Sequence, residues 1–191
     1  MKSFIRFSYV LFAINYVMST KLPGNLVKVF VYGTLKRGEP NHHCLTRNEN
    51  GHSRFVCEAQ TIKKFPLVIG TRYNIPFLLN KPGSGHNIWG EVYEVDDKMF
   101  ANLDVLEDYP DYYDREIQQV KNKDNELFDC WLYLIKEFPE QLLSKRHLES
   151  YHNTQELPYC ESYLDSSKND LHVENELNRI KGTTLNSTNA Q

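Results

Sequence analysis

The 191-residue chain lacks the short motifs that mark several large classes of protein. It contains no glycine-rich phosphate loop and no dinucleotide fingerprint, so the sequence does not support nucleotide-dependent chemistry. It has no stripe of Lys and Arg, and its formal net charge of −3 gives no electrostatic reason to expect a nucleic-acid partner. Its four cysteines form no C-x-x-C pair and match no zinc module, so we expect no metal site.

One short group of side chains looks like a set of metal ligands, namely His42, His43 and Cys44. Adjacent residues rarely point at a single metal ion, so this group does not change the expectation. If the protein is secreted, one or two disulfides can form, and their pairing is not defined by the sequence.

The N-terminus bears on the compartment. Lys2 and Arg6 precede a mostly apolar run, residues 7–18, as in a secretory signal peptide of residues 1–19. This run is too short for a comfortable membrane span, so we expect no stable membrane association. The alternative is an uncleaved cytosolic extension, since Asn15 interrupts the apolar run. The protein is therefore expected to be secreted if the leader is removed and cytoplasmic otherwise.

Short apolar runs separated by polar turns make up most of the remaining chain, which is typical of short strands. We expect strands at residues 27–32, 55–62, 65–70, 88–95, 115–120 and 127–135, and helices at 42–45 and 96–107. Many strands with one or two helices indicate an α+β fold, a small mixed β-barrel-like sheet with flanking helices. The domain is expected to span residues 26–164. Residues 165–191 form a polar tail with a weak helix at 165–181.

The predicted helix at 96–107 carries an acid on its apolar face. The apolar residues Met99, Phe100, Leu103 and Leu106 recur at the spacing of one helical face, and Glu107 falls in line with them. Burial raises the pKa of a carboxylate, so such an acid can exchange a proton near neutral pH, as a general acid/base must. The alternative is that Glu107 lies at a frayed helix end and reaches water or pairs with Arg115.

Two loops are candidates for a binding pocket. Tyr32-Gly33-Thr34-Leu35 directly follows the first predicted strand, and its backbone N–H groups could bind an anion; the alternative is an ordinary strand-ending turn. Residues 74–76 and 82–85 frame a second loop, which could wall a pocket and contain a cis Ile75–Pro76 bond. The alternative, a plain surface connection, is favoured because cis X-Pro bonds are uncommon.

Residues 29–42 (VFVYGTLKRGEPNH) resemble the opening of the gamma-glutamylamine cyclotransferases, within the gamma-glutamylcyclotransferase-like (AIG2-like) superfamily. Further segments follow in the order found in that family: 74–79, 82–85, 90–93, Leu103-Asp104-x-x-Glu107 and Tyr113-x-Arg115. The similarity runs from about residue 27 to residue 139 and weakens afterwards. The leader and the longer tail depart from the family pattern.

The resemblance implies a role for each matching residue. Glu107 would be the catalytic acid/base, and Tyr32, Gly33, Thr34 and Leu35 would bind the glutamyl end of the substrate. From the residues alone, Tyr113-x-Arg115 either braces the segment after Glu107 or consists of exposed strand residues. The family fold is a small barrel-like sheet with flanking helices, and its usual location is cytosolic.

The implied reaction converts a small molecule, γ-glutamyl-ε-lysine from degraded transglutaminase cross-links, to 5-oxoproline and free lysine. It needs no metal or organic cofactor, and we expect the enzyme to be a monomer. Two alternatives remain open: a cyclotransferase for other γ-glutamyl amino acids or glutathione, and a non-catalytic binding module on the same fold. A hydrolase using Cys44 and His42 ranks last because it lacks an orienting partner.

Overall fold

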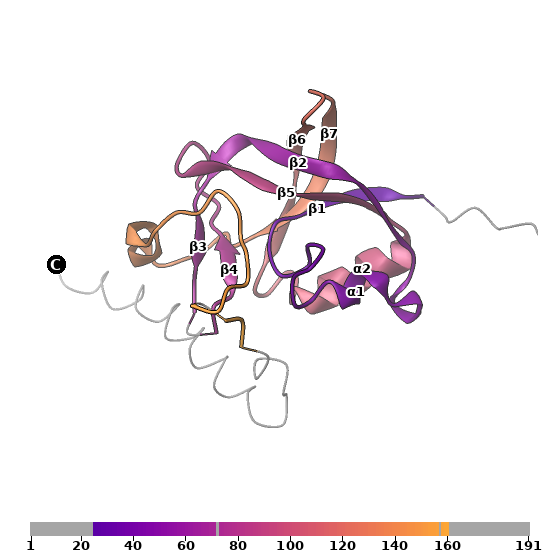
Figure 1. The fold of residues 1–191 in the computed structure, drawn as a ribbon, viewed down its shortest axis with the longest axis horizontal. Coiled ribbons are helices and arrows are strands. Elements are labelled where there is room, and N and C mark those ends of the chain that lie inside the picture. Colours follow the sequence, from indigo (N-terminus) through magenta and orange to yellow (C-terminus); the bar gives the residue numbers. More distant parts are fainter. Residues whose placement is uncertain (1–24, 72, 157, 161–191) are drawn as a thin grey trace, which may run out of the picture.

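Five strands close into a barrel in the order β1-β5-β2-β6-β7 (Figure 1). Their bounds are β1 Val27–Val31, β2 Ser53–Phe65, β5 His86–Val95, β6 Asp114–Asn122 and β7 Leu127–Leu134. All neighbouring strands run antiparallel except β1 and β7, which pair in parallel at a single position, Val29 with Trp131. This barrel confirms the expected α+β fold.

The structure is a computed structural model that describes residues 25–71, 73–156 and 158–160. The predicted leader, the polar tail at 165–191 and the predicted helix at 165–181 lie outside the described residues.

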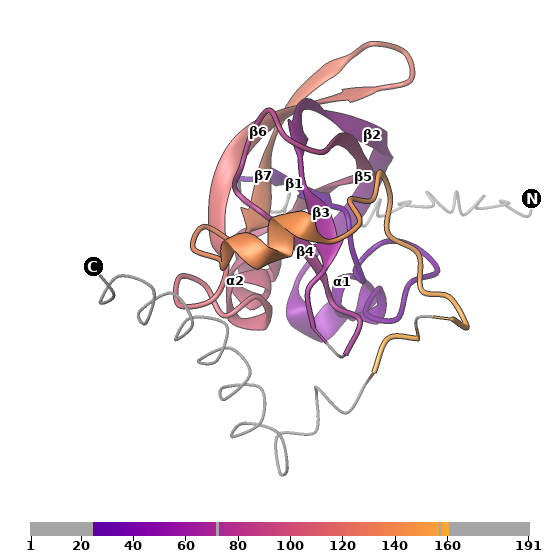
Figure 2. The same ribbon diagram turned by 90° about the vertical axis from the view of Figure 1, so that its left-hand side faces the viewer.

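The other elements gather around one end of the barrel (Figures 1 and 2). They are the two-stranded sheet of β3 (Leu67–Ile69) and β4 (Pro76–Leu78), the helices α1 (His43–Thr46) and α2 (Asp97–Leu106), and the 3-10 turns η1 (Asn48–Asn50) and η2 (Glu140–Ser144). Helix α2 begins where the Asp96 side chain accepts a hydrogen bond from the Met99 amide (2.8 Å), a standard N-cap. Strand β4 and turn η2 were not expected from the sequence.

Alternation along β1 divides the buried residues into two cores. Val29 and Val31 belong to a cluster that also contains the buried face of α2, whereas Phe30 and Tyr32 belong to a second cluster formed by the barrel strands. Gly90 on β5 permits β1 to pass closely, because a Cβ there would collide with the Val31 carbonyl oxygen. The strand that supports both cores therefore leads straight into the loop at residues 32–35.

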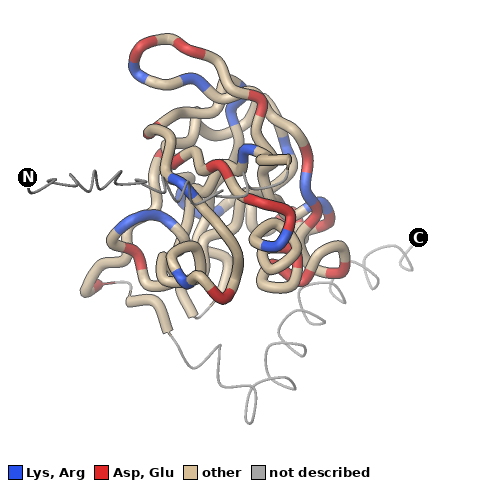
Figure 3. Tube along the Cα trace, turned by 90° about the vertical axis from the view of Figure 1, so that its right-hand side faces the viewer, with Lys and Arg blue, Asp and Glu red and all other residues tan. Residues whose placement is uncertain are grey.

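Charges of both signs are interspersed along the described chain (Figure 3). None of the helices among the described residues is long and apolar enough to cross a membrane. All four cysteines lie in the described part, where Cys44, Cys57 and Cys130 are free thiols.

Candidate active site

The end of helix α2 fixes the position of Glu107. The Glu107 amide still bonds to the Leu103 carbonyl (2.9 Å), but the next residue, Asp108, adopts a left-handed conformation with φ of 50°. The Tyr109 amide then bonds back to the Asp104 carbonyl (2.9 Å), which closes a Schellman-type helix end. Glu107 therefore lies at the last position before the chain turns, held by backbone hydrogen bonds on both sides.

Arg115 braces this helix end without touching the Glu107 carboxylate. Its Nε lies 3.1 Å from Asp104 Oδ1, which also accepts the Tyr133 hydroxyl (2.7 Å). Its guanidinium lies over three aromatic rings, those of Phe100, Tyr109 and Trp131. The expected brace on the segment after Glu107 is confirmed. The alternative in which Arg115 pairs with Glu107 is wrong, because Arg115 pairs instead with Asp104, one helical turn earlier.

The Glu107 side chain lines a pocket and lacks a polar partner. No hydrogen bond or ion pair joins its carboxylate to another described residue, and burial raises its pKa to about 7. The residue keeps partial solvent exposure, so the desolvated carboxyl still faces the pocket. Burial, and next the nearby Glu107 charge, raise the pKa of Tyr32 well above its usual value. The pocket therefore holds an acid that is half-protonated near neutral pH.

The loop at residues 32–35 lines the same pocket. The Lys36 amide bonds to the Gly33 carbonyl (3.2 Å), which makes Thr34 and Leu35 the central residues of a β-turn. The amides of these two central residues have no acceptor among the residues that the structure describes, so they are available to an anionic ligand. Gly33 is needed for close packing, since a Cβ there would lie 2.9 Å from Pro76 Cγ on β4.

The remaining described lining of the pocket is mostly apolar and aromatic. It includes Ile75, Pro76, Leu103, Leu106, Tyr112, Tyr113, Tyr133 and Tyr159. Among the described lining residues, Glu107 is the one acidic side chain, and no Lys or Arg side chain accompanies it. The segment at 74–76 thus helps to wall the pocket, whereas the turn at 82–85 is not among the described lining. The cis bond raised as one alternative for Ile75–Pro76 is not observed, and the cis peptide bond among the described residues is Tyr109–Pro110.

Sequence reasoning assigned no role to two polar residues of the pocket, Asn41 and Tyr159. The Asn41 amide nitrogen donates to Thr34 Oγ1 and to the Tyr159 hydroxyl, both at 3.1 Å. Asn41 lies inside the segment that resembles the cyclotransferases, so that segment contained a usable signal. Tyr159 lies beyond it, and no local pattern indicates its place.

The ligand-like group at residues 42–44 does not form a metal site. His42 Nδ1 bonds to the Leu35 carbonyl (2.9 Å), and His43 Nδ1 bonds to the Pro40 carbonyl (3.1 Å). Cys44 Sγ lies 3.6 Å from His43 Nε2 rather than against His42. In the described part of the chain, no three His, Cys, Asp or Glu side chains gather closely enough to hold a metal ion.

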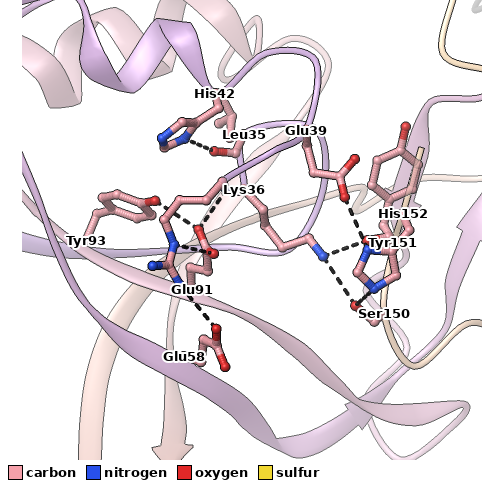
Figure 4. Close-up of polar contacts among 11 residues, drawn as sticks. Leu35, Lys36, Glu39, His42, Glu58, Glu91, Tyr93, Ser150, Tyr151 and His152 are labelled. Carbon is pink, nitrogen blue, oxygen red and sulfur yellow. Dashed lines mark hydrogen bonds and ion pairs between the residues drawn. The ribbon is translucent and has the colours of Figure 1, made fainter. Parts of the chain in front are cut away.

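A second glutamate provides a useful contrast with Glu107. Glu91 on β5 accepts hydrogen bonds from the Arg37 amide (3.0 Å), from Arg37 Nε (2.9 Å) and from the Tyr93 hydroxyl (2.8 Å) (Figure 4). Burial alone would raise the pKa of Glu91, but these hydrogen bonds lower it. Glu91 is therefore an ionised, fully engaged anchor for the chain after the 32–35 loop, whereas Glu107 is free to exchange a proton.

Comparison with known proteins gives consistent matches over the described barrel. The family model described as "Gamma-glutamyl cyclotransferase, AIG2-like" matches residues 29–153. A Drosophila melanogaster protein named "Putative gamma-glutamylcyclotransferase CG2811" is 61% identical over 146 residues, covering 75% of this chain and 93% of that protein. The Bos taurus gamma-glutamylaminecyclotransferase is 41% identical over 133 residues, covering 67% of this chain and 77% of that protein. The crystal structure of an AIG2-like protein from Mus musculus superposes with a TM-score of 0.68 at 38% identity, covering 71% of this chain and 95% of that one.

Proposed function

Because the chain belongs to the gamma-glutamyl cyclotransferase, AIG2-like family and is an enzyme of the cyclotransferase type, we propose that it acts on γ-glutamyl amines through Glu107. The proposed substrate is γ-glutamyl-ε-lysine, and the products are 5-oxoproline and lysine. The observation that carries this proposal is a desolvated glutamate that has no polar partner among the described residues and shares one pocket with the 32–35 loop.

The reaction needs no protein nucleophile, because the substrate carries its own. The α-nitrogen of the glutamyl group attacks the γ-carbonyl carbon, forms a five-membered lactam and breaks the bond to the amide nitrogen. Two protons leave the attacking nitrogen, and two reach the departing nitrogen, so there is no net proton change when both amines are ammonium ions in water. Holding the amine against the carbonyl in a folded rotamer supplies the orientation that such a ring closure requires.

Glu107 suits the proton transfers. As a carboxylate it takes a proton from the α-ammonium, which cannot attack while it is fully protonated, and as an acid it returns a proton to the departing amine. A pKa of about 7 populates both forms near neutral pH. Positioned proton transfer of this kind contributes about 10² to 10⁴-fold to a rate.

The free amides of Thr34 and Leu35 suit the anionic parts of the substrate. Backbone N–H groups held in a turn can bind the α-carboxylate or stabilise the oxyanion that develops on the γ-carbonyl. They are neutral, so they do not lower the pKa of Glu107 as an arginine or lysine would. We assign the glutamyl end of the substrate to this loop, with Tyr32 and Gly33 forming its start.

The charge pattern of the lining favours amines over α-amino acids as leaving groups. A leaving α-amino acid places its carboxylate one carbon from the scissile nitrogen, beside Glu107 and without a described cation in the lining. Like charges in such a setting repel and lose hydration. In γ-glutamyl-ε-lysine, an alkyl chain separates the scissile nitrogen from the other charges, and this chain suits the apolar wall of Ile75, Pro76 and Leu106.

The test is a panel of γ-glutamyl compounds with mass spectrometry for 5-oxoproline. We expect product from γ-glutamyl-ε-lysine and much less from γ-glutamylalanine or glutathione. Preferred turnover of γ-glutamylalanine would reassign the enzyme to γ-glutamyl amino acids. Tight binding of the panel with no product would indicate the non-catalytic binding module.

A further inference from the structure

Residues 150–156 and 158–160, here called the C-terminal segment, are tied to the turns that follow the 32–35 loop. Lys36 Nζ donates to the Tyr151 carbonyl (2.6 Å), and a carboxylate oxygen of Glu39 lies 3.2 Å from His152 Nδ1 (Figure 4). Lys36 is itself buried, so its ammonium group depends on these protein partners. The start of the C-terminal segment is thus fixed to residues 36–39, which follow the 32–35 loop.

The far end of the C-terminal segment reaches the pocket through Tyr159. The Tyr159 amide bonds to Asn153 Oδ1 (2.7 Å), and its hydroxyl accepts the Asn41 amide hydrogen (3.1 Å). Because Asn41 also bonds to Thr34, the Tyr159 ring is tied to the pocket loop through one intermediate side chain. The ring is therefore held in place from both ends.

The burial pattern shows where this ring lies. The described residues at 152–156 and Pro158 are exposed, whereas Tyr159 is only 9% exposed and lines the pocket with Glu107. The described part of the C-terminal segment thus runs along the surface (Figure 2, orange). The buried Tyr159 ring is the part of it that lines the pocket. The ring thus adds an aromatic face to the pocket that holds Glu107, the residue proposed to return a proton to the departing amine.

The family match ends before this ring. It covers residues 29–153, which include the 32–35 loop and Glu107 but not Tyr159. The groups proposed for the chemistry are therefore within the shared domain, while one wall of the pocket is supplied by the sequence that follows it. A residue placed in this way can change which amine fits without changing the reaction itself.

We propose that Tyr159 is a specificity-determining residue whose ring packs against the alkyl chain of the leaving amine. This inference rests on the proposed cyclotransferase function and names the part of the site that selects among γ-glutamyl amines. An aromatic ring against a chain of methylenes favours long amines over short ones, since each methylene held in an apolar site changes kcat/KM by about 10-fold or more.

The experiment compares two substrates in the full-length chain, γ-glutamyl-ε-lysine and γ-glutamyl-methylamine. The ratio of their kcat/KM values is measured from 5-oxoproline release for the wild type, Tyr159→Ala and Tyr159→Phe. We expect Tyr159→Ala to lower the ratio by about 10-fold or more, while Tyr159→Phe keeps the ring and stays near the wild-type ratio. If Tyr159→Ala is unfolded at the assay temperature, Tyr159→Leu replaces it, with the same direction expected.

The matched control is Tyr151→Phe in the same segment. Tyr151 is buried, its hydroxyl has no hydrogen-bond partner among the described residues, and it does not line the pocket. We therefore expect the wild-type ratio in this variant. An unchanged ratio in Tyr159→Ala, or an equal fall for both substrates, would overturn the specificity role and leave the proposed function intact. Absence of 5-oxoproline from the wild type with every γ-glutamyl amine would overturn the function and this inference together.

Discussion

Replacement of Glu107 by Gln tests the catalytic role and the desolvation of the carboxyl in one variant. The amide keeps the shape of the side chain but cannot exchange a proton in the required way. We expect lysine release from γ-glutamyl-ε-lysine to fall by about 10² to 10⁴-fold, the usual contribution of a positioned acid/base.

Above about pH 7, the Glu107→Gln variant should be more stable than the wild type. Burial raises the Glu107 pKa from 4.5 to about 7, so the unfolded chain releases this proton at lower pH than the folded one. Folding stability therefore falls as the pH rises from about 4.5 to about 7, and it stays lowered above that range. A difference of this size corresponds to about 3 kcal/mol, an upper value because the residue keeps some exposure. The Gln variant has no carboxyl group at this position, so its folding stability does not show this decrease with rising pH.

Urea unfolding at pH 4.5 and pH 8 measures the effect. The stability of Glu107→Gln relative to wild type should rise by as much as about 3 kcal/mol between the two pH values. The matched control is Glu91→Gln, where the sign reverses: hydrogen bonds lower the Glu91 pKa, so its loss should destabilise more at pH 8 than at acid pH. Parallel pH–stability curves for wild type and Glu107→Gln, together with near-normal turnover, would refute the reasoning.

Three other predictions use the same site. The wild-type kcat/KM should rise up to tenfold per pH unit and level off above about pH 7, as the Glu107 base forms; a flat profile between pH 5.5 and 7.5 would contradict the assignment. Gly33→Val should cost more free energy of substrate binding, taken from the rise in KM, than free energy of unfolding, because the new side chain pushes Pro76 into the pocket. Equal losses of the two free energies would indicate a plain turn. Asp108→Gly should stabilise by up to about 1 kcal/mol in urea unfolding, since φ of 50° favours glycine, and destabilisation would contradict this account of the helix end.

Periodicity in the sequence predicted the elements that carry the catalytic candidate. The helix expected at 96–107 is observed at Asp97–Leu106, and Glu107 follows it directly, as its place on the apolar face indicated. The strand expected at 27–32 is β1, and it leads into the 32–35 loop. These features come from local patterns, which depend only on neighbouring residues and on helix or strand geometry.

The features that were missed depend on contacts between distant residues. Tyr159 meets Asn41 across 118 positions, and a single side-chain hydrogen bond of that span leaves no periodic trace. Strand β4 has only three residues and begins with a proline, so it carries too little alternation to recognise. The sequence left open whether Arg115 pairs with Glu107, and only the geometry of the helix end shows that its partner is Asp104.

The closure of the barrel between its first and last strands means that no excised fragment can reproduce the site. Strand β1 pairs with β5 along one edge and with β7 along the other, where the two strands meet at one ladder position, Val29 with Trp131. A peptide of residues 29–42 alone would contain the sequence motif but would lack the pocket-lining residues that other elements supply, such as Ile75, Leu103 and Glu107. Ligand binding in this pocket is therefore a property of the closed barrel, which requires the first and last strands to pair.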